Sequence, residues 1–257
     1  MLPLMSFGDH LEVLRRMLWR LALVLCALTA GIFCLKEPVF DILLAPKECD
    51  FVTFRLIEEL LRGFGSDFRF EPWRIALINT ELSGQFMAHV TSSFYLAALV
   101  ASPYILLEVF GFVSPALYDN ERRLAVRVGG MMYGLFALGV AMNYFVLFPI
   151  SFRFLGTYQV SADVTNAITL DSYISTFSTL TFMMGVVFQL PLVCWFLGRI
   201  GLLSADVMRR YRRHALVGIM VLAAVITPPD IFTLLLVTVP LYLLYEVSIW
   251  VVRTKKP

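Results

Sequence analysis

Long apolar runs without any charged residue alternate with short charged segments along this chain. The first four runs cover residues 21–35, 82–107, 128–152 and 172–198. An ionisable side chain inside hydrocarbon is costly unless it is paired or hydrated, so gaps between charges mark membrane spans well. The first run is short, but Arg20 lies close enough to its boundary to reach the headgroups. The pattern predicts four membrane-spanning helices in this part of the chain.

Two further apolar runs follow near the end of the chain, and both are shorter. Residues 215–229 and 231–245 each contain 15 uncharged residues, and Asp230 in the sequence TPPDIF separates them. Two prolines followed by an aspartate predict a turn between two helices. A helix of that length covers about 22 Å, against a hydrocarbon thickness of about 30 Å. We expect both helices to thin the bilayer locally or to be shielded by partners, unless residues 211–214 and 246–252 extend them.

The predicted fold class is all-α: a polytopic membrane protein with six transmembrane helices in one domain, residues 1–257. The expected spans cover approximately residues 18–35, 82–108, 128–150, 172–197, 214–228 and 231–252. With the N-terminus inside, fourteen of the 21 Lys and Arg residues fall on the cytoplasmic side, and six of the other seven lie in one long outer loop. Because positive charge is enriched in cytoplasmic loops, we expect both termini to be cytoplasmic.

The long loop over residues 36–80 is too patterned to be a simple connector. Within it, the sequence FVTFRLIEELLRGF has a helical period and places apolar residues on one face, with Glu58 and Arg62 four residues apart beside them. The face consists of Phe54, Ile57, Leu60, Leu61 and Phe64. The pattern predicts a short amphipathic helix at the outer membrane surface. A small helix packed on the loop's own residues fits the pattern equally well.

Composition agrees with a membrane protein and excludes several other classes. The 257 residues are 59% hydrophobic and 16% charged, with a mean hydropathy of +0.79, whereas soluble domains carry about 25% charged residues. A net charge of +2 without a basic tract does not indicate nucleic-acid binding. The spacing of the four cysteines suggests neither a disulfide framework nor a metal site. The sequence contains no catalytic motif and no nucleotide-binding loop, so we expect no enzyme, no cofactor and no metal.

A sparse set of polar residues lies within or at the edges of the expected spans. Such groups are costly in lipid and normally face a partner or a hydrated cavity. Each also has a structural explanation: a headgroup position for Glu108, interhelical hydrogen bonds for Gln189 and Glu246, or turn formation for Asp230. The residues alone leave both explanations open. Prolines at positions 103, 149, 191 and 240 lie in or at the ends of spans, where they predict bends.

Two clusters on the expected cytoplasmic side place carboxylates beside arginines. One is DHLEVLRR before the first span, and the other is SPALYDNERR between the second and third spans. Cytoplasmic topology explains the arginines but not the carboxylates. An acidic pocket at this face would suit a guanidinium, whose planar fork pairs bidentately with a carboxylate.

Several long motifs resemble the TatC family, the largest membrane subunit of the twin-arginine protein translocase. They are DHLEVLRR, LAPK, SPYILLEVFGFVSPALYDNERR, NYFVLFPISFRFL, DSYIS, FQLP, RRHALV, TPPD and PLYLLYEVSI, in an order that covers nearly the whole chain. The resemblance implies a six-helix, glove-shaped receptor in the cytoplasmic (inner) membrane that binds the paired arginines of signal peptides on folded cargo. It also implies single-span partners of the TatA and TatB types, homo-oligomeric assembly and export driven by the proton-motive force.

The resemblance also assigns roles to individual residues. Glu121 in NERR matches the glutamate proposed to meet the twin arginines, with Phe112 and Pro115 in the same inner loop and Pro103 at the preceding bend. Three positions match residues linked to partner contact and function, namely Asp230 in TPPD, Glu246 in YEVSI and Pro46 in the first outer loop.

Three positions depart from the family pattern. The family motif HLxELR reads HLEVLR here, so Val13 occupies the expected glutamate position and Glu12 is the neighbouring acid, about 100° away on a helix. Gln189 replaces the acid of FELP, and Leu234 replaces an expected glutamine after TPPD. Glu12 can substitute for the missing acid, or recognition can rest on Glu121 alone. Gln189 retains hydrogen-bonding capacity but carries no charge.

The leading hypothesis is that Glu121, helped by Glu12 and Glu108, binds the guanidinium pair of a signal peptide at the cytoplasmic face. A second hypothesis is that Gln189 and the hairpin of the last two spans contact partner helices. A small-solute secondary transporter is the alternative function, because polar residues and bending prolines are common there too, although no internal repeat is visible. An intramembrane hydrolase is a third possibility, weakened by the lack of a nucleophile and base.

Overall fold

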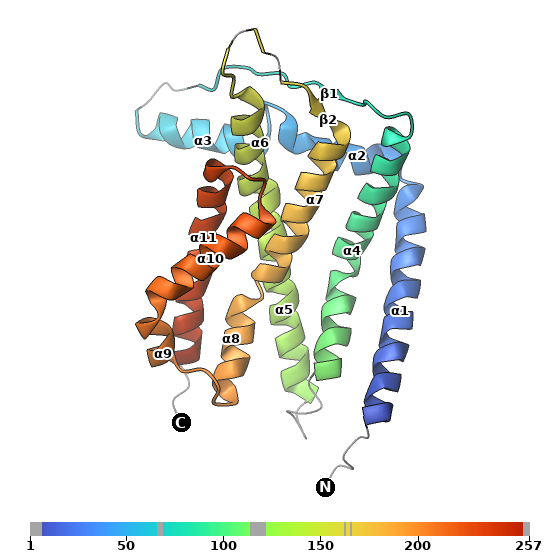
Figure 1. The fold of residues 1–257 in the computed structure, drawn as a ribbon, viewed down its shortest axis with the longest axis vertical. Helices are drawn as coiled ribbons and strands as arrows, with labels where there is room; N and C mark the ends of the chain where they lie inside the picture. The colour runs from blue at the N-terminus through green and yellow to red at the C-terminus, as the bar shows by residue number, and fades with distance from the viewer. Residues whose placement is uncertain (1–6, 66–68, 114–121, 162, 165, 254–257) are drawn as a thin grey trace. The chain divides into compact units, whose positions relative to one another are not determined.

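In a computed structural model of the chain, the described residues are 7–65, 69–113, 122–161, 163–164 and 166–253 (Figure 1). Most of them are helical, which confirms the predicted all-α class. The helices are α1 (Phe7–Phe33), α2 (Lys36–Leu44), the 3₁₀ helix η1 (Ala45–Lys47), α3 (Val52–Gly63), α4 (Gly84–Val113), α5 (Arg122–Met142), the π-helix η3 (Asn143–Leu147), α6 (Phe148–Thr157), α7 (Leu170–Val187), α8 (Leu190–Arg199), α9 (Ala205–Arg210), α10 (Arg212–Ile226) and α11 (Ile231–Arg253).

Five helical segments among the described residues are long and apolar enough to cross a membrane. They are Leu11–Phe33, Gly84–Val109, Val128–Thr157, Leu170–Arg199 and Ile231–Val252. Large apolar side chains remain exposed along them, including Leu23, Val100 and Val239. Such exposure is costly in water but favourable against lipid tails.

The chain divides into two compact units. One contains the described residues of Met1–Val39 and His89–Gly134, and the other contains those of Phe40–Ala88 and Leu135–Pro257. In the first unit the ring of Phe33 in α1 stacks on His89 in α4, with the ring centroids 4.1 Å apart. A Cβ atom at Gly129 in α5 would lie 2.5 Å from Cδ2 of Leu107 in α4. These contacts join α4 to both α1 and α5.

Aromatic rings form the centre of the second unit. Phe148 of α6 packs edge-on against Tyr173 and Phe177 of α7, at centroid distances of 5.1 and 4.9 Å. The buried hydroxyl of Tyr173 donates a 2.8 Å hydrogen bond to the carbonyl of Leu43 in α2, which connects α2 to this core. Buried tyrosines normally need such a partner for their hydroxyl.

Two helices in the second unit are interrupted near prolines, as the sequence predicts. The π-helix η3 ends directly before Phe148 and Pro149, and its buried Asn143 donates a 2.8 Å hydrogen bond to Oγ1 of Thr181 in α7. The expected fourth span is divided into α7 and α8, because Pro191 near the start of α8 has no N–H to continue the helical ladder. Neither the π-helix nor the exact break is visible in the hydropathy pattern.

The connection between α1 and α4 contains the predicted amphipathic helix as α3, and the sequence reading missed helix α2. Phe54 of α3 is buried, whereas Leu60 and Phe64 are strongly exposed, so only part of the apolar face packs on the protein. Further along, the strands β1 (Leu77–Ile78) and β2 (Ile168–Thr169) pair in parallel and link this connection to the segment before α7 (Figure 1).

The last two expected spans differ more from each other than their uncharged runs suggest. α10 is short, with 15 residues between Arg212 and Ile226. α11 continues through Glu246 to Arg253 and has 23 residues, so for this helix the structure supports the alternative that residues 246–252 extend it. Arg212 and Tyr242 both contact the carboxylate of Glu246, which lowers the cost of an acid in this membrane helix. α11 packs against α8 and α10 (Figure 1).

Candidate functional site

A groove in the first unit brings together residues of α1 and α4. It has a volume of about 440 Å³ and is lined by Val13, Met17 and Arg20 from α1 and by Tyr104, Leu107, Glu108, Gly111 and Phe112 from α4. The spacing of three and four residues along each helix places these side chains on one face of it. The groove therefore combines one acid and one base with an apolar wall.

Glu108 is the centre of the polar part of this groove. Its side chain is only 18% exposed, and Oε1 lies 3.1 Å from Nη1 of Arg20, which is itself 56% exposed. The hydroxyl of Tyr104, one turn earlier on α4, donates a 2.9 Å hydrogen bond to the same oxygen. A half-buried carboxylate held by a phenol and an arginine is a ready acceptor for a second guanidinium. It can also exchange one guanidinium for another.

Glu12 lies on a different face of α1 from the groove. Its carboxylate is 48% exposed and pairs with Arg16 one turn later, at 2.5 Å. Val13 lines the groove instead. The position at which the family pattern expects a glutamate therefore faces Glu108, and the acid of this chain is displaced from it by one residue.

The other residues that the sequence assigns to signal-peptide binding lie in different places. Phe112 lies in the last turn of α4 and lines the groove, so its expected place in an inner loop is wrong; the helix simply continues five residues beyond the expected end of the span. Pro103 is inside α4, beside Tyr104, and is half-buried. Glu121 and Pro115 lie outside the described residues.

The residues expected to contact partners do not form one site. Pro46 is buried in η1, and Gln189 is buried at the junction of α7 and α8, its Nε2 3.5 Å from the carbonyl of Gly185. Asp230 caps α11, its Oδ1 accepting a 2.6 Å hydrogen bond from the N–H of Thr233. Glu246 lies sixteen residues further along α11, about 24 Å away, and pairs with Arg212 at 2.6 Å.

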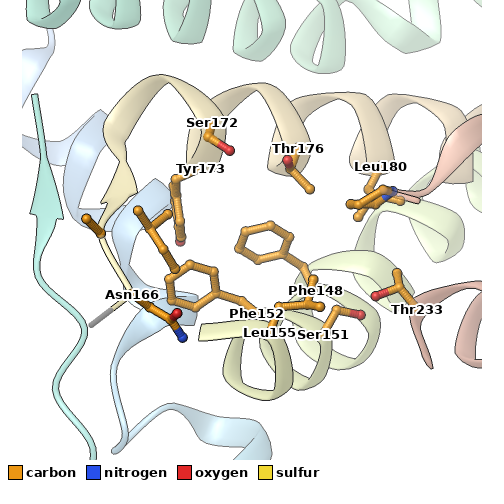
Figure 2. A pocket seen from close by; sticks show the side chains of 13 residues that line it. Phe148, Ser151, Phe152, Leu155, Asn166, Ser172, Tyr173, Thr176, Leu180 and Thr233 are labelled. Atoms are coloured by element: carbon orange, nitrogen blue, oxygen red, sulfur yellow. The ribbon is translucent and has the colours of Figure 1, made fainter. Parts of the chain in front are cut away.

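A second cavity, of about 320 Å³, lies between α6, α7, β2 and the turn before α11, near Asp230 (Figure 2). Phe148, Phe152 and Tyr173 line it (Figure 2), and both phenylalanine rings pack edge-on against the tyrosine, at centroid distances of 5.1 and 5.0 Å. The hydroxyls of Ser151 and Thr233 are buried there without a hydrogen-bond partner among the described residues. The lining contains no charged side chain, so this cavity offers a guanidinium no carboxylate to pair with.

Sequence reasoning identified Glu108 and Phe112 but missed the contacts that shape the groove. The Tyr104–Glu108 pair has helical i, i+4 spacing and was readable from the sequence. The Arg20–Glu108 pair joins positions 88 residues apart, and no local pattern reports such a contact. The outward face of Glu12 follows from helical geometry once α1 is known to begin before it.

Comparisons with known proteins agree on one family. The family model described as "Sec-independent protein translocase protein (TatC)" matches residues 9–240. A TatC protein of Blattabacterium sp. subsp. Periplaneta americana is 34% identical over 251 residues, covering 96% of this chain and 94% of the relative. The TatC protein of Escherichia coli K12 is 34% identical over 191 residues, covering 71% of this chain and 70% of the relative.

A solved structure has the same fold. A crystal structure of a twin-arginine translocase receptor TatC matches with a TM-score of 0.74 and 26% identity, covering 95% of this chain and 98% of that one. Helical architecture and these matches together define a multi-pass membrane protein of a protein-translocation system, without enzymatic function. The chain belongs to the TatC family of Sec-independent protein translocases. Membership favours protein translocation over the small-solute transporter and the intramembrane hydrolase.

Proposed function

We propose that this chain is the subunit of a twin-arginine translocase that binds twin-arginine signal peptides at the cytoplasmic face. The observation that carries the proposal is the half-buried carboxylate of Glu108, which already holds the guanidinium of Arg20 at 3.1 Å. An arginine of the signal peptide would replace or join Arg20 there. Desolvation by the groove strengthens such a charge-assisted contact relative to one at an open surface.

The other residues of this group would complete the peptide site. Phe112 and Leu107 offer an apolar wall to side chains beside the arginine pair. Glu121, one residue before α5 begins, would meet the second guanidinium, while Pro103 and Pro115 would set the course of the chain around the site. Glu12 would contribute long-range attraction rather than a direct contact, because it faces away from the groove.

Partner binding belongs to the second unit in this proposal. TatA- and TatB-type single-span helices would pack on the exposed apolar residues of α10 and α11, among them Val221, Val225, Leu235 and Val239. Gln189, Asp230, Glu246 and Pro46 would support those contacts, and copies of the chain would associate in the assembled translocase. The complex would export folded proteins across the cytoplasmic (inner) membrane using the proton-motive force, with six spans and both termini cytoplasmic.

Complementation tests the function as a whole. In a strain lacking its own TatC and supplied with matched TatA and TatB proteins, expression of this chain should restore export of a folded reporter carrying a twin-arginine signal. Glu108→Gln should lower export severalfold at equal membrane abundance, whereas Glu12→Gln should leave it within about twofold. Absence of export with the unaltered chain and matched partners would refute the proposal.

Crosslinking tests the peptide site directly. A signal peptide with a photoreactive group beside its arginines should label residues 104–112 and the segment around Glu121. Labelling should fall in Glu108→Gln and in Glu121→Ala, and it should fall in the unaltered protein when Lys replaces both peptide arginines. Undiminished labelling in Glu121→Ala would remove Glu121 from the site, and the same result in Glu108→Gln would remove Glu108.

A further inference from the structure

Arg153 occupies an unusual place for a charged residue. It lies on α6, four residues and about 6 Å before the end of the candidate span Val128–Thr157. This depth corresponds to the boundary between hydrocarbon and headgroups. The side chain is half-buried rather than extended into water.

Three aromatic rings surround its guanidinium. The Cζ atom lies 3.9 Å from the ring centroid of Phe70, 4.4 Å from that of Trp73 and 5.5 Å from that of Phe54. Phe54 comes from α3 and packs edge-on against both Phe70 and Trp73, at 5.5 and 4.7 Å. The π-systems of these rings attract the cation but offer its N–H groups no conventional hydrogen-bond acceptor.

The N–H donors of Arg153 have no acceptor in the part of the chain that the structure describes. Among the described residues, the guanidinium forms neither a hydrogen bond nor an ion pair. Glu58 acts on it electrostatically, but Oε1 of that carboxylate accepts a 2.8 Å hydrogen bond from the N–H of Phe70. A guanidinium carries five N–H donors, and leaving them unmatched at the edge of a bilayer is costly. An acceptor from outside the chain would remove this cost.

A groove of about 350 Å³ opens beside the guanidinium. Apart from Arg153 and Thr157, its lining is apolar, with Ile57 from α3, Ile150 and Phe154 from α6 and Phe232 from α11. The hydroxyl of Thr157 donates its hydrogen bond to the backbone carbonyl of Arg153, so this hydroxyl proton does not compete with the guanidinium for an acceptor on a ligand. Leu56, Leu60 and Ile231, on the neighbouring surfaces of α3 and α11, are each more than half exposed. This surface is suited to acyl chains.

We propose that this groove binds a membrane phospholipid, with Arg153 donating hydrogen bonds to the phosphate and the apolar lining receiving an acyl chain. Two oxygens of a phosphate can accept hydrogen bonds side by side from the planar fork of a guanidinium, and a phospholipid presents its phosphate at this depth of the bilayer. The bound lipid would join α3, α6 and the start of α11 at the membrane surface. The site requires no twin-arginine peptide and is independent of the proposed function.

Lipid titration of the purified full chain tests the proposal. Native mass spectrometry in detergent should detect one tightly bound phosphatidylglycerol, and Arg153→Gln should weaken its binding about tenfold. Arg62→Gln is the matched control, because Arg62 is an exposed arginine of α3 that does not line the groove; its effect should stay within about twofold. Equal weakening by both substitutions would indicate general charge attraction and overturn the proposal.

A thermal measurement separates lipid binding from a purely structural role of the aromatic cluster. Phosphatidylglycerol should raise the Tm of the unaltered chain and of Arg62→Gln but not of Arg153→Gln. An unchanged lipid-induced Tm increment in Arg153→Gln, whatever its basal Tm, would mean that Arg153 only clamps the rings. The same increment with diacylglycerol of identical chains, or with excess inorganic phosphate alone, would also refute phospholipid binding.

If Arg153→Gln does not fold, lipid binding at this groove can still be tested on the unaltered chain. Phosphatidylglycerol carrying a photoreactive headgroup should label peptides that contain Arg153–Thr157 or Phe54–Ile57, and unlabelled phosphatidylglycerol should compete. Labelling confined to other segments would refute the site.

Discussion

At the scale of single residues, Val13 and Glu12 are neighbours on α1, but their side chains point to different faces of the helix. Val13 lines the groove with Glu108, whereas Glu12 pairs with Arg16 on the exposed side of α1. We predict that Val13→Glu tightens binding of a twin-arginine peptide about fivefold, because it adds a carboxylate to the groove or draws Arg20 away from Glu108. Peptide titration by fluorescence anisotropy measures the change. Glu12→Gln is the control and should have little effect; the reverse outcome would make Glu12 the binding acid.

Glu246 shows how a polar residue in a span can be satisfied within the protein. Its Oε2 lies 2.6 Å from Nη2 of Arg212, and both side chains are partly exposed, at 32% and 46%. We predict that a double-mutant cycle of Arg212→Gln and Glu246→Gln gives a coupling of about 1 kcal/mol, since exposed pairs are weak. Thermal unfolding in detergent measures it. If Glu246→Gln lowers export much more than Arg212→Gln at equal stability, Glu246 also contacts a partner.

At the scale of elements, α5 and α7 approach each other at glycines. A Cβ atom at Gly139 would lie 2.5 Å from the carbonyl oxygen of Met184, which is backbone and cannot move aside cheaply. We predict that Gly139→Ala destabilises the protein by about 1–3 kcal/mol through overpacking. Gly134→Ala on the same helix has open space and should be neutral or stabilising, by up to about 1 kcal/mol. Chemical unfolding in mixed micelles compares the unfolding free energies of the two variants. Equal unfolding free energies would show that α5 and α7 can separate without cost.

The helices were predictable because charge and hydrocarbon are incompatible, and this rule acts locally along the chain. The helix interruptions lie near prolines, which the sequence also indicates, whereas the side-chain pairings depend on contacts that are distant in sequence. The π-helix at residues 143–147 forms where Asn143 meets Thr181, and α11 passes through Glu246 where Arg212 meets it. The candidate site follows the same division. Glu108 stands out as a charge at the end of an apolar run, whereas its contact with Arg20 requires the packing of α1 on α4.

At the scale of the whole molecule, α10 is shorter than the helical segments that form the other expected spans. Its 15 residues cover about 22 Å, whereas α11 has 23 residues. The other four candidate segments have between 23 and 30 residues each. Several apolar side chains of α10 are exposed, including Val217, Val221 and Val225. A short helix with an exposed apolar surface favours local bilayer thinning or cover by a partner helix.

Membrane orientation is the prediction that tests the molecule as a whole. The positive-inside distribution places the α2–α3 connection outside and the α8–α9 connection inside. Cys49 is exposed in the former, and Leu202 is 75% exposed in the latter. In a variant that retains only Cys49, with Ser at the other three cysteines, a membrane-impermeant maleimide should label intact spheroplasts. Leu202→Cys in a cysteine-free background should be labelled only after permeabilisation.

Accessibility in the opposite order would place the groove of Glu108 on the outer side, where it could not meet a signal peptide before export. Labelling of both sites in intact spheroplasts would instead mean that an even number of crossings, and not the expected three, lies between Cys49 and Leu202. A third variant with its cysteine at Pro229, exposed in the turn between α10 and α11, tests separately whether α10 crosses. If all six spans cross, Pro229→Cys should be labelled from outside, as Cys49 is, because one crossing by α10 lies between it and Leu202.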